Sequence, residues 1–270
     1  MKGYVYKISK IVQVDSIKSG FEDIFDNNFR FDGERHEAWE FLYVLGGCIG
    51  VSVEDSVYEL NPGSLIFYAP GQFHSIWAAH GTKIHLIIMS FSLHGEDITD
   101  LGGKVFEVGT KEDGLIHSAL EAHIQAYHQK DAFANHIVAL KIEELILTIL
   151  SRKSSGVLGM DTSQTNSYKT IIRIMNDHLY DNLSASEIAS YCNLSLPNMK
   201  KIFRKFTRRG VIQYYRGLRM LKAKELIKQG KSMAEVSDIL HFSSQHYLTE
   251  SFKRQYHMTP SEYKKIILSD

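Results

Sequence analysis

The sequence predicts an α+β protein of two domains: an N-terminal β-barrel with flanking helices, and a C-terminal all-α domain that contains two helix-turn-helix units. Short apolar runs separated by turn residues fill roughly the first 110 positions, whereas apolar residues recur at helical spacing from position 167 onward. Charge divides the chain at the same place. Residues 166–270 contain 18 Lys and Arg against 9 Asp and Glu, and residues 1–165 contain 13 against 22. A basic part beside an acidic part is typical of a nucleic-acid-binding module joined to a second domain.

Composition limits the class of protein. With 44% hydrophobic residues over 270 positions, the chain can bury two cores of ordinary size. Two cysteines, Cys48 and Cys192, are too few for a disulfide framework or a zinc cluster. The start has no apolar run of signal-peptide length, and no run approaches the ~18 residues that span a bilayer. We therefore expect a cytoplasmic protein with no membrane partner. No Ser-His-Asp set or phosphate-binding glycine loop indicates an enzyme, and we expect no cofactor.

The N-terminal strands are marked by runs rich in β-branched and aromatic residues. These runs cover residues 41–45, 49–53, 64–68 and 84–91. Turn signals separate them at 46–47, 61–63 and 70–71. Several short strands with regular turns predict a sandwich or a barrel. We expect residues 1–29 to form an N-terminal arm and a first strand.

Polar residues at fixed spacing lie among these strands. The spaced residues are Glu34, His36, Glu40, Gly47, Gly63, Pro70, Gly71 and His74. This spacing resembles the two-motif pattern of cupin (jelly-roll) barrels, which implies that His36, Glu40 and His74 meet inside the barrel. The chain departs from that pattern where Glu34 occupies the first histidine position and Ala78 replaces a frequent Asn.

The period changes to helical between residues 112 and 152, where two helices are expected. The second helix is apolar on more than one face. One face can cover the barrel and the other can meet a partner, or both can belong to an intramolecular core. Residues 153–166 are small, polar and aperiodic, and we expect them to form a linker. The expected domains are therefore residues 1–152 and 167–270.

Two helix-turn-helix units follow. Ser184 with Glu187, and Ser232 with Glu235, have the spacing of capping boxes at the start of a short helix. A connecting helix is expected over residues 211–228. The last unit ends in a helix capped by Ser243 or Ser244. Its buried face is expected to contain Tyr247, Leu248, Phe252 and Tyr256.

The C-terminal motif is specific enough to indicate a family. Residues 234–253 and 258–263 resemble the signature of AraC/XylS-family transcription regulators, and residues 219–227 resemble the connecting helix of that family. The resemblance implies two helices that enter successive major grooves of double-stranded DNA. It also implies an N-terminal domain that binds a small-molecule effector and dimerises. Activation, with contact to RNA polymerase, is the usual mode in the family.

Four turn positions depart from the family pattern. His241 and His257 replace glycines in the second unit, and Asn193 and Arg208 replace glycines in the first. A left-handed conformation at such residues costs on the order of 1 kcal/mol per site.

The resemblance also implies which side chains face DNA. Base-facing candidates in the first unit are Pro197, Asn198, Lys201 and Arg204. In the second unit they are Ser244, Gln245, His246 and Thr249. Lys253 and Arg254 are expected to contact phosphate.

Three functions of the barrel remain open. It can be a sensor in which His36, Glu40 and His74 bind an effector, with a sugar as the first candidate because Trp39, Tyr43 and Trp77 can stack on one. It can instead hold Fe(II), Mn(II) or Zn(II), with enzymatic chemistry as an extension of that alternative. The candidate metal ligands are Glu34, His36, Glu40 and His74. It can also be a ligand-independent dimerisation domain. Strand alternation places Trp39 and Tyr43 opposite to Glu40, which argues against a single cavity lined by all three.

Overall fold

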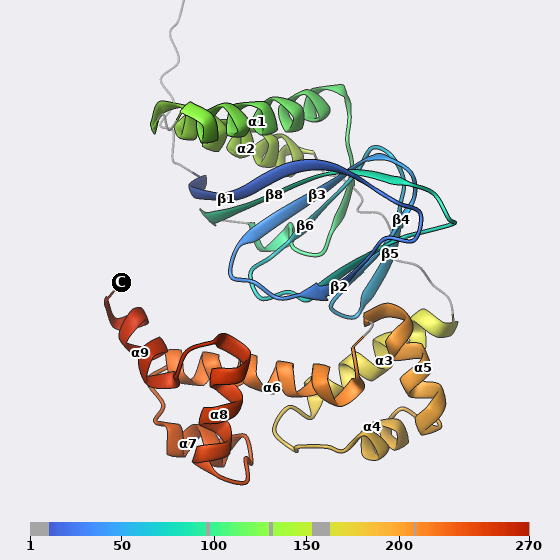
Figure 1. The fold of residues 1–270 in the computed structure, drawn as a ribbon, viewed down its shortest axis with the longest axis vertical. Helices are drawn as coiled ribbons and strands as arrows, with labels where there is room; N and C mark the ends of the chain where they lie inside the picture. Colours follow the sequence, from blue (N-terminus) through green and yellow to red (C-terminus); the bar gives the residue numbers. More distant parts are fainter. Residues whose placement is uncertain (1–10, 96–97, 130–131, 153–162, 208, 270) are drawn as a thin grey trace, which may run out of the picture. The chain divides into compact units, whose positions relative to one another are not determined.

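The computed structural model describes residues 11–95, 98–129, 132–152, 163–207 and 209–269. The chain divides into two compact units, Met1–Met160 and Asp161–Asp270, each of which is described by itself (Figure 1). The expected N-terminal arm lies outside the described residues. Most of the expected linker does so as well, but helix α3 (Ser163–Asp177) already includes its last four positions. That part of the linker prediction is wrong, because Thr165 is buried in the first turn of an amphipathic helix.

The N-terminal unit contains two antiparallel sheets. The five-stranded sheet has the order β1-β8-β3-β6-β9, and the four-stranded sheet has the order β2-β7-β4-β5. The strands of the first sheet are β1 (Val12–Phe25), β3 (Trp39–Gly46), β6 (Ser64–Tyr68), β8 (Ile84–Gly95) and β9 (Val105–Glu107). Those of the second are β2 (Arg30–Glu34), β4 (Ile49–Val53), β5 (Ser56–Leu60) and β7 (His74–Ala78).

Strand β3 shows how the sequence fills both sides of the five-stranded sheet. Leu42 and Val44 belong to the apolar cluster between the two sheets. Trp39, Phe41 and Tyr43 belong to a second cluster that includes residues of the helices α1 (Thr110–Gln129) and α2 (Ala132–Ser151). Because successive side chains of a strand point to opposite faces, one strand serves both clusters. Figure 1 shows α1 and α2 lying along this sheet, beside β1 and β8.

The C-terminal unit is helical throughout its described residues. After α3 come α4 (Ala185–Tyr191) and α5 (Leu196–Thr207), then α6 (Val211–Lys228), and then α7 (Met233–Ile239), α8 (Gln245–Tyr256) and α9 (Pro260–Ser269). The pairs α4–α5 and α7–α8 are the two helix-turn-helix units, and α6 connects them over the expected residues (Figure 1).

Local signals in the sequence set the ends of these helices. Both expected capping boxes are present: Ser184 and Ser232 each accept from the backbone three residues on, and Glu187 and Glu235 accept in return. Ser244 caps α8 by accepting from the Tyr247 amide at 3.1 Å. These contacts satisfy backbone donors that a helix start otherwise leaves free.

The residues that replace glycine do adopt the left-handed conformation. Asn193 has φ 53°, His241 has φ 47° and His257 has φ 56°. His257 donates its amide to the Lys253 carbonyl at 2.8 Å and so ends α8. Arg208 lies outside the described residues. The turn geometry of the family is thus kept at these three sites despite the bulkier side chains.

Candidate functional site

A cavity of ≈ 430 Å³ lies between the two sheets of the N-terminal unit. Its walls come from β1 and β8 on one side and from β2 and β7 on the other, with the 36–40 segment at one end. Most lining side chains are apolar: Phe21, Phe25, Phe29, Phe31, Ala38, Ile76, Leu86 and Ile88. The polar lining residues are Lys18, Ser19, Glu34, His36, Glu40 and Ser90. A concave, mainly apolar site with a few converging polar groups is the usual form of a small-molecule site.

Glu40 is the centre of the polar end. Its Oε2 accepts from Ser90 Oγ at 2.5 Å. His36 Nε2 lies 3.5 Å from Oε2, and His74 Nε2 lies 3.5 Å from Oε1. Burial alone would raise the pKa of Glu40, but the contacts with His36, His74 and Ser90 lower that pKa to about 2. A buried carboxylate therefore stays ionised here because polar neighbours compensate its lost hydration.

The two histidines present the same ring atom to Glu40. His36 Nδ1 donates to the Ala38 carbonyl at 3.0 Å, and His74 Nδ1 donates to the Gln72 carbonyl at 3.3 Å. This assignment of the proton follows from the carbonyl partners, which can only accept. The interaction with Glu40 raises the pKa of His36 above its ordinary value. Each Nε2 is consequently turned toward the carboxylate, or toward any molecule bound beside it.

One buried polar atom near Glu40, Tyr68 Oη, has no hydrogen-bond partner among the described residues. Tyr68 is fully buried and pairs with Glu40 across strands β3 and β6. Its ring stacks on His74 with centroids 4.2 Å apart. Buried polar groups are nearly always hydrogen-bonded, so this hydroxyl indicates a place for water or a bound ligand.

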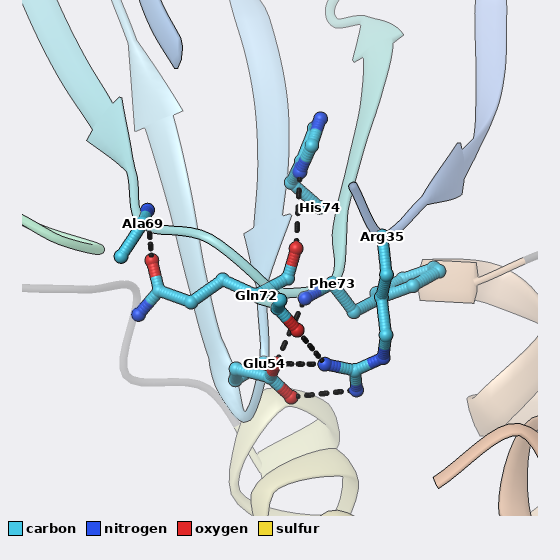
Figure 2. A network of polar contacts seen from close by, with 7 residues as sticks. Arg35, Glu54, Ala69, Gln72, Phe73 and His74 are labelled. Atoms are coloured by element: carbon cyan, nitrogen blue, oxygen red, sulfur yellow. Dashed lines mark hydrogen bonds and ion pairs between the residues drawn. The ribbon is translucent and has the colours of Figure 1, made fainter. Parts of the chain in front are cut away.

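A network of polar contacts fixes the loops that hold the two histidines (Figure 2). Arg35, next to His36, donates to Glu54 at 2.9 Å and to the Gly71 carbonyl at 2.5 Å. Glu54 also accepts from the Phe73 amide at 2.8 Å, one residue before His74. The Gly71 amide donates to the His36 carbonyl at 2.8 Å, which ties the two loops directly. The site is therefore held by rigid contacts before any ligand arrives.

The structure brings together some of the expected effector residues and separates others. His36, Glu40 and His74 converge, whereas Trp39 and Tyr43 face the helices; Tyr43 Oη donates to Asp113 of α1 at 2.7 Å. Trp77 packs over Gly50 and under the guanidinium of Arg30.

The expectation that Trp39, Tyr43 and Trp77 line the cavity is thus wrong. The reason is strand alternation, since Trp39 and Tyr43 are one and three positions from Glu40, and Trp77 is one position from the inward-facing Ile76.

Sequence reasoning missed the aromatic residues of the cavity wall. Phe21 and Phe25 are on β1, Phe29 follows that strand, and Phe31 is on β2. The rings of Phe25 and Phe29 have centroids 4.0 Å apart. Aromatic residues near the N-terminus were the available signal, but only the register of β1 with β8, in which Phe21 pairs with Ile88, shows which of the β1 residues share the cavity with β8.

The candidate metal ligands only partly converge. Donor atoms of Glu34, His36 and His74 lie within 4.8 Å of one another. Two imidazoles and a carboxylate are a suitable set for Fe(II), Mn(II) or Zn(II). The Nδ1 contacts of both histidines to carbonyls are the outer contacts that orient metal-binding imidazoles.

The candidate DNA-facing residues lie on two exposed helix faces. In α5, Pro197, Asn198, Lys201 and Arg204 are exposed while Met199 and Phe203 are buried beneath them. In the second unit the candidates Ser244, which caps α8, and Gln245, His246, Lys253 and Arg254 of α8 are exposed. Thr249 is half-buried, and its hydroxyl donates to the Gln245 carbonyl at 2.9 Å.

One expectation about α8 is wrong. Tyr247 was assigned to the buried face, but it is 39% exposed, whereas Leu248 and Phe252 are buried. Its ring lies 6.1 Å from that of Phe242, at the edge of the helix interface. Tyr247 therefore borders the exposed face together with Gln245 and His246.

Among the described residues, no helix has both the length and the apolar character that crossing a membrane requires.

Two family models match the chain. One, described as an AraC-like ligand binding domain, matches residues 21–150. The other, described as a helix-turn-helix domain, matches residues 188–266. Together they span most of the sequence and correspond to the two units of the structure.

Relatives of similar length agree with these matches. The Msm operon regulatory protein of Streptococcus mutans is 29% identical over 258 residues, which cover 90% of this chain and 89% of that protein. The probable transcriptional regulator LumQ of Photobacterium leiognathi is 24% identical, with 86% and 91% covered.

Solved structures are more distant. ToxT of Vibrio cholerae shares 13% identity over 96% of this chain and 98% of that chain, with a TM-score of 0.40. That TM-score is too low to transfer any detail of a site.

Proposed function

The chain belongs to the AraC family of DNA-binding transcription regulators with an N-terminal ligand-binding domain, and we propose that it is an activator whose DNA binding responds to a small molecule held in the barrel cavity. The observation that carries this proposal is the cavity itself. It combines a mainly apolar wall, with four phenylalanines, and an ionised Glu40 at its polar end. No catalytic activity is proposed.

The cavity favours a ligand with an apolar body and one polar group. Four phenylalanines line the wall, so the body gains by leaving water. An amino group can donate to Glu40 and to His36 Nε2 at the same time, and a hydroxyl can donate to Glu40 while it accepts from Nε2 of a protonated His36. A sugar was the first candidate because of Trp39, Tyr43 and Trp77, which lie elsewhere, and a fully hydroxylated ring would leave most of its polar groups unpaired against this wall.

A thermal-shift screen tests the ligand class. The probes are phenols and aromatic amines, aromatic carboxylates, and monosaccharides, each added to the full-length protein. A ligand at 100 times its Kd stabilises the folded state by about 2.7 kcal/mol. We expect a phenol or aromatic amine to raise the melting temperature. The substitution Ile88→Trp fills the cavity and should remove the shift, whereas Ile24→Trp, at an exposed position of β1 that does not line the cavity, should retain it. Stabilisation by monosaccharides alone, or full binding to Ile88→Trp, would contradict the proposed ligand class.

A divalent metal at Glu34, His36 and His74 is the second candidate, because their donor atoms already lie within 4.8 Å of one another. Elemental analysis of the purified protein distinguishes the two. One equivalent of metal that is lost in His74→Ala would support this alternative.

We propose that α5 and α8 read DNA in successive major grooves. In this proposal the exposed Gln245 pairs with adenine through its amide, and the exposed Lys253 and Arg254 contact phosphate. An activator that acts in this way works in the cytoplasm and contacts RNA polymerase.

We also propose that the protein is a homodimer through α1 and α2. Large apolar side chains on these helices are exposed: Ile124, Tyr127, Phe133, Ile137, Leu140 and Leu147. A group of this kind on one surface is typical of an interface. Light scattering of Leu140→Glu should show monomers, whereas the control Ile24→Glu on β1 should remain dimeric; the two side chains are 62% and 61% exposed. A dimer that persists in Leu140→Glu would place the interface elsewhere.

A further inference from the structure

A second group of metal-ligand residues lies outside the cavity wall. Cys48 immediately precedes β4, Glu59 is on β5, and His80 follows β7 in the turn before β8. Their donor atoms all lie within 4.8 Å of one another, and His80 Nε2 is 2.9 Å from Glu59 Oε1. None of the three lines the cavity.

The strand register explains why these residues meet. Strands β7, β4 and β5 are neighbours in the four-stranded sheet, and Ile49 pairs with Leu60 on one side and Ala78 on the other. Cys48 lies one position beyond Ile49, His80 lies two positions beyond Ala78, and Glu59 lies one position before Leu60, paired with Gly50. All three residues are therefore at one end of the sheet, where three neighbouring strands bring their donor atoms together.

The backbone around this point is fixed without a ligand. The Cys48 amide donates to Thr82 Oγ1 at 3.0 Å, and Thr82 Oγ1 donates to the Ala79 carbonyl at 3.0 Å. The Ala79 amide donates to the Cys48 carbonyl at 2.9 Å. These contacts hold the cysteine and the turn with His80 in one geometry, which reduces the ordering cost of binding an ion.

The three donor types are a thiol, an imidazole and a carboxylate. This mixture suits zinc and the metals that substitute for it, such as cobalt(II), because they accept sulfur, nitrogen and oxygen ligands together. Cys48 is buried, whereas His80 is 64% exposed and leaves a path for an ion to enter.

We propose that Cys48, Glu59 and His80 form a three-ligand site for a divalent transition metal ion of the zinc class, with the fourth position open to water or a small ligand. On binding, the Cys48 sulfur gives its lone pair to the ion and its proton passes to the solvent. Because a metal-bound cysteine is a thiolate, binding releases one proton from Cys48. The bound ion links β4, β5 and the β7–β8 turn.

Cobalt(II) is the probe, because a thiolate ligand gives a charge-transfer band in the near ultraviolet that oxygen and nitrogen ligands do not give. Full-length protein is reduced, freed of metal and titrated with cobalt(II). We expect one equivalent to produce the band, and zinc(II) to remove it. The cavity cluster of Glu34, His36 and His74 contains no sulfur, so cobalt bound there leaves this band absent.

Matched variants assign the band. Cys48→Ser should lose it while circular dichroism shows an unchanged fold, and Cys192→Ser should retain it, since Cys192 lies in the C-terminal unit. His80→Ala should retain a weaker band with cobalt affinity reduced by roughly tenfold or more, because even outer contacts of a metal ligand are worth ~10–100-fold. The proposal is overturned if the folded wild-type protein gives no band, if the band survives in Cys48→Ser, or if it vanishes in Cys192→Ser.

Discussion

Arg219 of α6 connects the two helix-turn-helix units, and its removal should destabilise the C-terminal unit selectively. The side chain is 2% exposed. Its guanidinium donates to the Leu179 carbonyl at 3.1 Å, to the Asn182 side chain and to the Leu240 carbonyl. Leu179 and Asn182 lie in the loop between α3 and α4, which leads into the first helix-turn-helix unit, and Leu240 ends α7 of the second. The charged group also lies 4.5 Å from the centroid of Phe242.

The magnitude follows from the three acceptors. In Arg219→Leu the buried Leu240 carbonyl loses its donor, and an unsatisfied buried group costs about 1–3 kcal/mol. The half-buried Leu179 and the exposed Asn182 can turn to water instead, so their loss adds less. Leucine retains part of the contact with Phe242 and adds no buried charge. We therefore expect a loss of about 1–3 kcal/mol, which is a noticeable part of the ~5–15 kcal/mol that stabilises a typical domain.

The positions of the tryptophans provide the assay. Trp39 and Trp77 both lie in the N-terminal unit, so their fluorescence follows the unfolding of that unit. Helix-specific circular dichroism is dominated by the C-terminal unit. In a urea titration, Arg219→Leu should shift the dichroism transition to lower urea and leave the fluorescence transition in place. Arg216→Leu, an exposed position on the same helix, is the matched control and should shift neither. A loss below about 1 kcal/mol, or equal shifts of both signals, would refute the reasoning.

Three further predictions follow from other contacts. Gln245→Ala should relax the sequence preference of DNA binding by ~1–3 kcal/mol, whereas Lys253→Ala should weaken all sites and lower the salt slope by about one; titrations on specific and scrambled DNA at two salt concentrations check this, and identical behaviour of the variants contradicts it. The pKa of His36, read from its ring proton by NMR, should lie above 6.5 and fall in Glu40→Gln, because the contact with Glu40 is its main cause. Its contribution to stability is present below pH 6.5 and is lost as pH rises through the folded pKa. Finally, His257→Gly should stabilise the C-terminal unit by about 1 kcal/mol, since φ is 56° there; a loss of stability would show that the histidine ring makes a compensating contact.

Features set by neighbouring residues were predictable from the sequence. Capping boxes such as Ser184 with Glu187 depend on four consecutive positions, and both formed as expected. The left-handed conformations of His241 and His257 were predictable as well, because both residues stand at turn positions of the motif that a glycine usually occupies.

Features that depend on pairing between distant strands were not predictable in the same way. Ser90 donates to Glu40 from fifty positions away, and the phenylalanines of β1 face the cavity only through the register with β8. Strand alternation predicted that Trp39 and Tyr43 lie on the opposite face to Glu40. The orientation of Trp77 could not be predicted in this way, because the sequence does not show which face of β7 points inward. Tyr247 shows the same limit in a helix, since a spacing rule cannot distinguish a core position from its border.

Strand β3 has a mechanical consequence. Glu40 faces the cavity, while its two sequence neighbours Trp39 and Phe41 are embedded among the side chains beneath α1 and α2. Protein interiors are packed as densely as crystals and barely compress. A bound molecule that displaces the backbone of Glu40 by a fraction of an ångström must therefore push both aromatic rings against the helices. The cavity and the core beneath the helix pair are thus separated only by the backbone of the five-stranded sheet.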